Sequence, residues 1–300
     1  MGCEDLKNSY FISRVLKNFD QEPQGCRVID LTGKSLTKEL FQNEILTSKM
    51  PVLMKKGVPP GPREKWSPEN LKRYLKTREG NLWITRGVAD QGQSQFEEIS
   101  IRDYVDYLFD PENKNEEQEP MYVSISKEFM QILPDMVKEF EINRLLPPLY
   151  SKYPYAWLGP ERTVSGLHFD EYHSLFLQVW GNKTFLLFPP SNTSNLYLSE
   201  KYDWASKLSR VDLRQVESNR ENFPLIRQCT PMKTDVADCD LLWIPSGWVH
   251  FVYANVPTFS VTFFLASFFR FITFGVWEDW IKLALHNIGI YGRKNGCTCH

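Results

Sequence analysis

The chain has 300 residues and a formal net charge of −2 at neutral pH, with 42% hydrophobic and 24% charged residues. This composition is typical of a globular protein with a sizeable core. It argues against a chain-wide basic surface for nucleic acid, although a local basic patch stays open. The most apolar stretch, 256–276, carries Arg270 and reads partly as alternating strand, so we expect no membrane span.

Six cysteines are present, and the first twenty residues are charged and mixed, without the pattern of a secretory signal. We therefore expect free thiols in a reducing compartment, either the cytoplasm or the nucleus. Met1-Gly2-Cys3 is similar to an acylation start, but Leu6 stands where such a signal has Ser or Thr.

The first part of the chain, 1–120, is predicted to be an extension of helices and strands that packs on a central core. A helical or loose leader over 1–26 comes first. Thr37 and Ser67 are the expected N-caps of two of the helices that follow. The predicted elements are strands at 27–30, 50–54 and 82–85 and helices at 37–48, 67–76 and 100–109. The acidic segment 110–120 is predicted to be a surface loop.

The central part, 121–266, changes to short apolar runs separated by turns. A strand at 121–125 and a broken helical stretch at 129–150 lead into it. The further predicted strands are 155–158, 163–170, 174–180, 184–188, 241–244, 249–254 and 259–265. Gly181-Asn182 forms a hairpin turn, and the polar segment 189–231 reads as a functional insert or flap. This spacing predicts a sandwich or barrel within a mainly β fold that also has helices, of the α+β class.

The last part, 267–300, contains a predicted amphipathic helix at 276–290. Trp277 and Trp280 lie on its apolar side. Two interpretations stay open with equal weight. The helix packs back on the core, or it forms the interface of a homodimer.

His168 and Asp170 lie two residues apart in a predicted strand, so both side chains point to the same face. A second histidine, His250, would complete the facial triad of two imidazoles and one carboxylate that binds non-haem Fe(II). The alternative is a purely structural role, because a lone histidine in an apolar strand is usually a packed core residue. His173 offers another H-x-D-x-x-H set. It lies where the strand is expected to turn, so we expect it at the rim of the pocket or in solvent.

Several motifs surround these residues in order. They are Trp157-Leu158-Gly159, Ser165-Gly166-Leu167-His168-Phe169-Asp170, Leu177-Gln178-Val179-Trp180-Gly181-Asn182-Lys183, Leu187-Phe188-Pro189-Pro190, Asp240-Leu241-Leu242-Trp243-Ile244-Pro245 and Trp248-Val249-His250. With them the chain resembles the Jumonji C (JmjC) family of Fe(II)- and 2-oxoglutarate-dependent oxygenases, and within it the small single-domain hydroxylase branch. The resemblance implies a double-stranded β-helix core, a cupin-like jelly roll.

The resemblance also implies two groups of site residues. Lys183 would bind the far carboxylate of 2-oxoglutarate, and Ser165 and Tyr122 would place hydroxyl groups on it. The cosubstrate and O₂ would occupy the metal positions that the protein leaves open. The implied iron ligands are His168, Asp170 and His250.

Without the resemblance, Lys183 also fits a surface lysine at a hairpin end, and Tyr122 fits an ordinary half-buried strand tyrosine. Ser165 alternates with Leu167, so it shares the face of His168 only if the strand contains a bulge or a twist.

Three positions depart from the family pattern. Ser174 and Thr262 stand where relatives often have Asn, which puts the orientation of the ligands and the substrate in question. Cys239 stands where relatives usually have Gly, so a turn with positive φ would strain it.

The resemblance implies an enzyme that hydroxylates a protein side chain and releases succinate and CO₂. Histone lysine demethylation and hydroxylation of a tRNA base are alternatives within the same family. A catalytically silent jelly-roll binding module is the alternative from another class. A protein substrate is the expected partner, and nucleic acid stays open, although the near-neutral charge disfavours it.

Overall fold

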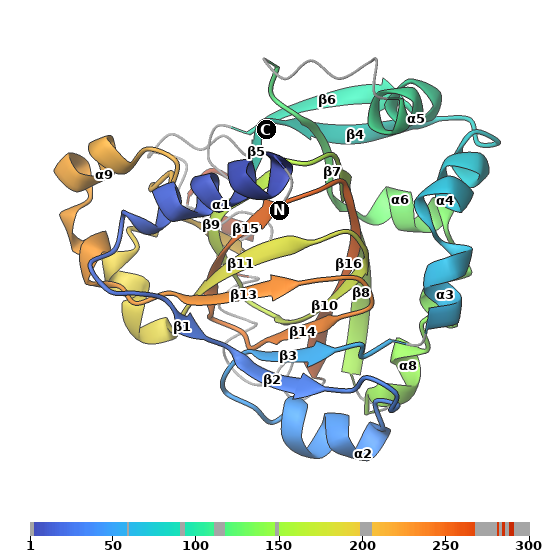
Figure 1. Cartoon of the computed structure of the whole chain (residues 1–300), viewed down its shortest axis with the longest axis horizontal. Helices are drawn as coiled ribbons and strands as arrows, with labels where there is room; N and C mark the ends of the chain where they lie inside the picture. The colour runs from blue at the N-terminus through green and yellow to red at the C-terminus, as the bar shows by residue number, and fades with distance from the viewer. Residues whose placement is uncertain are drawn as a thin grey trace.

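Two β-sheets face each other at the centre of the molecule, and helices cover their outer surfaces (Figure 1). The computed structural model describes residues 3–58, 60–90, 94–110, 118–147, 150–198, 206–267, 281, 284–285 and 288–290. One sheet has seven strands in the order β1-β13-β11-β15-β9-β12, with β5 beside β9. The other has nine strands in the order β2-β3-β14-β10-β16-β8-β7-β4-β6.

The strand bounds agree closely with the apolar runs of the sequence. The seven-stranded sheet contains β1 (Gln24–Gly25), β5 (Val88–Ala89), β9 (Val164–Asp170), β11 (Lys183–Phe188), β12 (Ser206–Leu208), β13 (Met232–Val236) and β15 (Val249–Ala254). The nine-stranded sheet contains β2 (Arg27–Asp30), β3 (Val52–Lys55), β4 (Asn81–Arg86), β6 (Gln95–Ser100), β7 (Met121–Ser126), β8 (Tyr150–Gly159), β10 (His173–Trp180), β14 (Leu241–Ile244) and β16 (Thr258–Ser267).

Local capping chemistry sets several of the helices. The Thr37 and Ser67 side chains accept hydrogen bonds from Leu40 N and Asn70 N, as expected of N-caps. The helix after Thr37 changes to π geometry after its first turn and ends earlier than expected. The helices are α1 (Cys3–Leu16), α2 (Lys38–Leu40) with the π-helix η1 (Phe41–Ile45), α3 (Pro60–Lys65), α4 (Pro68–Leu75), α5 (Ile101–Phe109), α6 (Lys127–Ile132), α7 (Met136–Glu139) and α8 (Ile142–Leu145).

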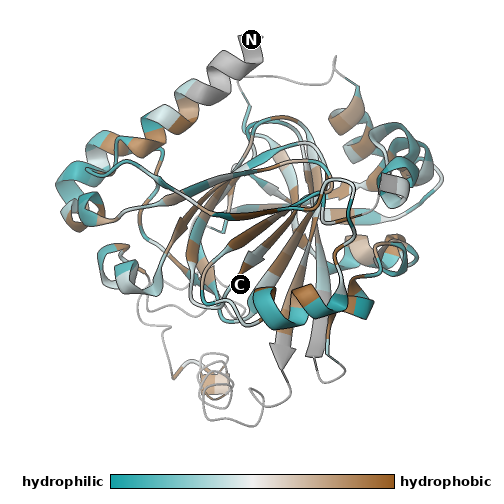
Figure 2. Ribbon diagram, turned by 60° about the horizontal axis from the view of Figure 1, so that its bottom comes forward, coloured by the Kyte–Doolittle hydropathy of each residue, from teal (hydrophilic) through white to brown (hydrophobic). Residues whose placement is uncertain are grey.

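An apolar cluster fills part of the interior between the two sheets, and Figure 2 shows the hydrophobic colour concentrated on the central strands. Phe176 of β10 and Phe185 of β11 meet there, with ring centroids 4.9 Å apart and planes at 71°. This edge-to-face contact joins the two sheets across the barrel interior. A larger apolar cluster fills the space between the nine-stranded sheet and the helices that cover it.

The segment 189–231 is more ordered than the expected flap. Beside β12 it contains the 3₁₀ helices η3 (Pro190–Asn195) and η4 (Pro224–Gln228) and the helix α9 (Val216–Asn222). Its scattered apolar side chains pack with α1 in one buried cluster. Asn219 donates to the side chain of Asn18 over 2.8 Å, and Asn18 donates to the Leu213 carbonyl over 2.9 Å. The N-terminal leader therefore anchors this segment through buried polar contacts.

Some predictions stay open. Most of the predicted loop at 110–120 and most of the helix at 276–290 lie outside the described residues, so the dimer interface stays a prediction. The division at 120 and 266 also stays a prediction, and strands from the first part extend the nine-stranded sheet. Within the described ranges, no helix is long and apolar enough to span a membrane.

Candidate active site

Three potential metal ligands converge between β9 and β15. His168 lies directly opposite His250 in the ladder of these strands, with the two rings 4.2 Å apart between centroids. Asp170 lies 4.0 Å from His168 Nε2 through Oδ1 and 3.7 Å from His250 Nε2 through Oδ2. All three residues are buried, and one ligand atom from each lies within 4.8 Å of the others. The sequence motif therefore becomes a compact N,N,O donor set.

The backbone orients both imidazoles. His168 Nδ1 lies 2.8 Å from the Gly166 carbonyl oxygen, and His250 Nδ1 lies 3.1 Å from the Trp248 carbonyl oxygen. A carbonyl accepts a hydrogen bond, so it favours the tautomer with the proton on Nδ1. The two Nε2 atoms are then left as acceptors that face the carboxylate of Asp170.

The surroundings shift the pKa values of the two histidines in opposite directions. Burial and the neighbouring His168 lower the pKa of His250 to about 4. Burial also acts to lower the pKa of His168, but the carboxylates of Asp90 and Asp170 outweigh it and raise that pKa overall. Neutral imidazole and carboxylate are the forms that bind a divalent metal. The donor set of two nitrogens and one carboxylate fits Fe(II) with open coordination positions.

Ser165 reaches the same cavity because β9 contains a bulge. The ladder with β15 pairs His250 with His168 and Val252 with Ser165, so three steps on β9 face two steps on β15. The extra residue turns Ser165 and His168 to one face of β9. An irregularity of this kind was the condition for both residues to belong to one site.

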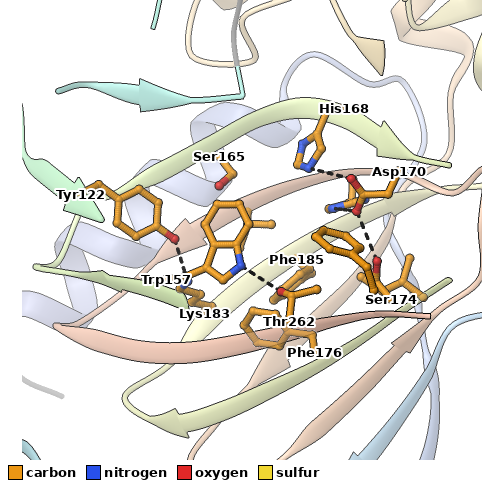
Figure 3. A pocket seen from close by; sticks show the side chains of 14 residues that line it. Tyr122, Trp157, Ser165, His168, Asp170, Ser174, Phe176, Lys183, Phe185 and Thr262 are labelled. Carbon is orange, nitrogen blue, oxygen red and sulfur yellow. Dashed lines mark hydrogen bonds and ion pairs between the residues drawn. The ribbon is translucent and has the colours of Figure 1, made fainter. Parts of the chain in front are cut away.

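Lys183 opens β11 and is only 2% exposed, which removes the alternative of a surface lysine. Its Nζ donates to Tyr122 Oη over 2.9 Å (Figure 3). It also donates to Ser260 Oγ over 2.9 Å. Burial lowers its pKa to about 7, although the charge of Asp90 acts in the opposite direction. Tyr122 is also buried, at 2% exposure, and burial raises its pKa well above the ordinary value.

All six predicted site residues line one cavity. Figure 3 shows Tyr122, Ser165 and Lys183 toward one end and His168 and Asp170 toward the other. Aromatic and aliphatic side chains form the walls between the two ends. Besides these six, the lining residues are Trp157, Ser174, Phe176, Phe185, Ile244, Val252, Thr262 and Phe264.

Two of the three positions that depart from the family pattern, Ser174 and Thr262, make contacts of their own. Ser174 Oγ donates to Asp170 Oδ2 over 3.3 Å, and Thr262 Oγ1 accepts from Trp157 Nε1 over 2.9 Å. The shorter side chains therefore orient a potential ligand and an aromatic wall. Cys239 has φ of 65°, so the expected strain at this position is present.

His173 does not join the metal group. Its ring stacks on Trp243 with centroids 5.0 Å apart, and its Nδ1 accepts from Ser246 N over 3.1 Å. It begins β10 instead of lying in the turn before it. The alternative H-x-D-x-x-H set is therefore excluded by position.

Two residues at the site were missed from the sequence. Ser260 alternates with Thr262 on β16, and this period of two is the signal that places both on the inner face. Asp90, whose Oδ2 lies 3.9 Å from His168 Nε2, follows a strand of only two residues. A strand of two residues is too short to show the alternation of apolar and polar positions by which strands are recognised in a sequence.

Comparisons with known proteins agree with this arrangement. A family described as "Cupin-like domain" matches residues 37–271. The chain is 28% identical over 260 residues to Jumonji C domain-containing protein 5 of Drosophila melanogaster. This alignment covers 83% of this chain and 62% of the relative. It is 30% identical over 112 residues to lysine-specific demethylase JMJ30 of Arabidopsis thaliana, covering 37% of this chain and 25% of the relative.

A human relative adds a second named activity. The chain is 26% identical over 153 residues to the bifunctional peptidase and (3S)-lysyl hydroxylase JMJD7 of Homo sapiens, covering 41% of this chain and 48% of the relative. The chain thus spans less than two thirds of the length of each of these relatives. Because the family match covers most of the chain and the sheets and helices have the predicted arrangement, the protein belongs to the cupin-like JmjC-domain family.

Proposed function

We propose that this protein is an Fe(II)- and 2-oxoglutarate-dependent dioxygenase that hydroxylates a side chain of a protein substrate. The observation that carries the proposal is the placement of a three-ligand donor set and a buried lysine in one cavity. A metal site alone would suit many cupin-like proteins. The lysine adds a partner for an anion that binds beside the metal.

His168, Asp170 and His250 would hold the iron. Their backbone contacts keep Nε2 of both histidines toward the metal position, and Ser174 restrains the carboxylate of Asp170. When bound, Fe(II) supplies the redox chemistry that couples oxidative decarboxylation of 2-oxoglutarate by O₂ to hydroxylation of the substrate. Three protein ligands leave room for both the cosubstrate and O₂.

Lys183 would bind the far carboxylate of 2-oxoglutarate. The ammonium group has three donors, and Tyr122 and Ser260 take two of them, which leaves one for the incoming carboxylate. The hydroxyl groups of Tyr122 and Ser165 can turn to donate to the same carboxylate. Burial strengthens each of these charge-assisted contacts, because water does not compete with them.

Apolar walls would keep water from the reacting atoms. Phe176, Phe185 and Trp157 line the cavity between its two ends. Trp157 is held in place by its hydrogen bond to Thr262. A dry cavity protects the oxidising chemistry from side reactions and holds the cosubstrate in one orientation.

The proposed substrate class is supported by the activities in the names of two relatives and by the near-neutral charge of the chain. Relatives named as a lysyl hydroxylase and as a lysine demethylase both act at lysine. Demethylation is therefore the second candidate, because hydroxylation of an N-methyl group leads to its loss. The cytoplasm or the nucleus remains the proposed location, and the described cysteines Cys26, Cys229 and Cys239 are free thiols.

The proposal is tested by titrating the purified protein with Fe(II) and 2-oxoglutarate without oxygen and recording the visible spectrum. A metal-to-ligand charge-transfer band that saturates with both additions is expected, followed by succinate formation when O₂ is admitted. A protein that binds neither would be the silent binding module. A single-oxygen mass shift on cell proteins identifies hydroxylation, whereas released formaldehyde identifies demethylation.

A further inference from the structure

Two large aromatic side chains are exposed on the strand pair β4 and β6, which ends the nine-stranded sheet at the top of Figure 1. Trp83 of β4 is 57% exposed and Phe96 of β6 is 62% exposed. In the antiparallel ladder Trp83 pairs with Glu98, and Phe96 lies two residues before Glu98 on the same face. The two aromatic residues are therefore diagonal neighbours. Single exposed apolar residues are common, but neighbouring exposed aromatic side chains are typical of interaction surfaces.

The register of three strands connects this face to the active-site cavity. Phe96 pairs with Thr85, and Thr85 pairs with Tyr122 of β7, which lines the cavity. Paired residues of a ladder point to the same face of a sheet. The aromatic pair and Tyr122 therefore lie on one continuous face, and two strand spacings, about 10 Å, separate Phe96 from Tyr122.

Hydrogen bonds hold this part of the sheet on both of its faces. On the face of the aromatic pair, the hydroxyl groups of Thr85 and Ser124 lie 2.6 Å apart and join β4 to β7. On the opposite face, Arg86 donates two hydrogen bonds to Glu97, over 2.9 and 2.8 Å, which join β4 to β6. Ile84, only 1% exposed, packs into the large apolar cluster on that side. A surface that is already rigid loses little conformational entropy when a partner binds.

The charge beside the aromatic pair decides between two classes of partner. Glu98 is exposed opposite Trp83 on the same face, and its carboxylate accepts a hydrogen bond from Asn81 over 3.1 Å. A carboxylate at this place repels the phosphate groups of nucleic acid, which binds through cations. The main chain of a polypeptide carries no charge. An extended segment also presents every second side chain to one face, the same period with which the sheet presents its own.

We propose that Trp83 and Phe96 are the docking surface for an extended segment of the polypeptide substrate, beside the residue whose side chain enters the cavity. The surface favours apolar side chains at alternate positions of that segment. This inference rests on the proposed function, which supplies the reaction inside the cavity. Neither aromatic residue lines the cavity, so the surface acts on the affinity for the substrate and not on the loading of the site with metal and 2-oxoglutarate.

The experiment uses the full chain loaded with Mn(II) and 2-oxoglutarate without oxygen, so that no turnover occurs. The probes are random peptides displayed on phage, selected in parallel on wild type, on a double variant with Trp83→Ser and Phe96→Ser, and on Tyr10→Ser. Tyr10 is 69% exposed on α1, so it is the matched control for the loss of an exposed aromatic ring. The peptides that wild type enriches are synthesised, and fluorescence anisotropy measures their dissociation constants.

We expect wild type to enrich peptides with apolar residues at alternate positions. Trp83→Ser and Phe96→Ser should each weaken the binding of these peptides about tenfold, as expected of losing an aromatic anchor of an interface. Phe96→Tyr should retain most of the affinity, and Tyr10→Ser should not change it. Mn(II), compared with diamagnetic Zn(II), should broaden the proton signals at the end of the bound peptide that reaches the cavity.

Separate readings distinguish this inference from the proposed function. Binding of Mn(II) and of 2-oxoglutarate is measured first, and a wild-type chain that binds neither contradicts the proposed function and with it the inference. In a chain that binds both, the docking surface is overturned if the enriched peptides share no apolar pattern. It is also overturned if both serine variants bind them as wild type does, or if Mn(II) broadens none of their signals.

Two other occupants of the face are tested with the same proteins. A single-stranded RNA oligonucleotide that binds wild type but not Phe96→Ser would assign the face to nucleic acid. A dimer in sedimentation that Phe96→Ser dissociates would assign it to a second copy of the chain. Either result overturns the proposal, whereas a wild type that binds no RNA and sediments alike with and without the substitution agrees with it.

Discussion

The ammonium group of Lys183 donates a hydrogen bond to the hydroxyl of Tyr122 over 2.9 Å, and both side chains are only 2% exposed. Desolvation opposes the charge of the lysine and lowers its pKa to about 7. Burial of Lys183 therefore costs stability, and an anion that pairs with its ammonium group would offset that cost. Two predictions follow from this cost, one for stability and one for pH dependence.

Lys183→Met is expected to stabilise the ligand-free protein while it removes binding of 2-oxoglutarate. Lowering the pKa of Lys183 from 10.5 to about 7 corresponds to a cost on the order of 5 kcal/mol at pH 7. Losing the hydrogen bonds to Tyr122 and Ser260 offsets about 1 kcal/mol each, so a net gain of about 2–3 kcal/mol is expected. Thermal unfolding and calorimetric titration measure the two effects.

The stability gain of Lys183→Met is nearly constant below pH 7 and becomes smaller as the pH rises above 7. The cost of burying Lys183 is fully present below its folded pKa of about 7 and disappears as the pH approaches 10.5, where the unfolded lysine also loses its proton. Lys138→Met, at an exposed lysine, is the control and should leave stability nearly unchanged. A Lys183→Met protein less stable than wild type at pH 7 would contradict the expectation.

Binding of 2-oxoglutarate is expected to weaken as the pH rises above 7. Below this value Lys183 already carries its charge, but above it a proton must be taken up when the anion binds. The affinity should fall by up to about tenfold for each pH unit. Titrations at saturating Mn(II) between pH 6 and 9 measure this slope. Lys183→Arg, which stays charged, should bind with little pH dependence, and an equal slope in both proteins would exclude Lys183 as its source.

His168→Ala and His173→Ala are expected to differ sharply in metal binding. His168 belongs to the buried donor set, whereas His173 stacks on Trp243 outside it. Loss of one of three protein ligands should lower metal affinity by at least about a hundredfold, more than the loss of an outer contact. His173→Ala should stay within about tenfold of wild type. Competition with a metal-binding dye measures both constants, and a reversed order would point to the other histidine set.

Gly181→Ala is expected to destabilise the fold and to disturb Lys183. Gly181 has φ of 85°, and a Cβ there would press against the carbonyl oxygen of Pro257. Strain in this turn and the clash together should cost about 2–4 kcal/mol. Gly25→Ala is the matched control, since a Cβ at Gly25 meets nothing within 4 Å and its φ is ordinary. Urea denaturation measures both, and equal midpoints would contradict the requirement for glycine.

Much of the site could be predicted because its signals are local. His168 and Asp170 are two residues apart on a strand, and Lys183 follows the glycine turn that begins β11. Ser165 was expected to share the face of His168 only through a bulge or a twist, and the register shift between β9 and β15 is the irregularity that brings it there. Ser67 and its proline likewise marked the start of α4 from neighbouring residues alone.

Other parts had no local signal. The segment 189–231 was interpreted as a functional insert or flap because it is long and polar, yet its scattered apolar residues pack together against α1. Asp90 follows a strand of two residues whose partner lies more than seventy positions further along the chain. Such pairings depend on the whole fold, so short strands and isolated side chains are not placed by periodicity.

The sequence by itself determined the chemistry that is present, namely two imidazoles, a carboxylate and a lysine in motifs with a fixed order. The tertiary structure decided which of these groups share one cavity and how burial shifts the pKa of Lys183. It excluded His173, brought Asp90 to within 3.9 Å of His168 and buried Lys183. The reason is physical: the identity of a side chain is local, whereas desolvation and long-range strand pairing depend on residues far apart in the chain.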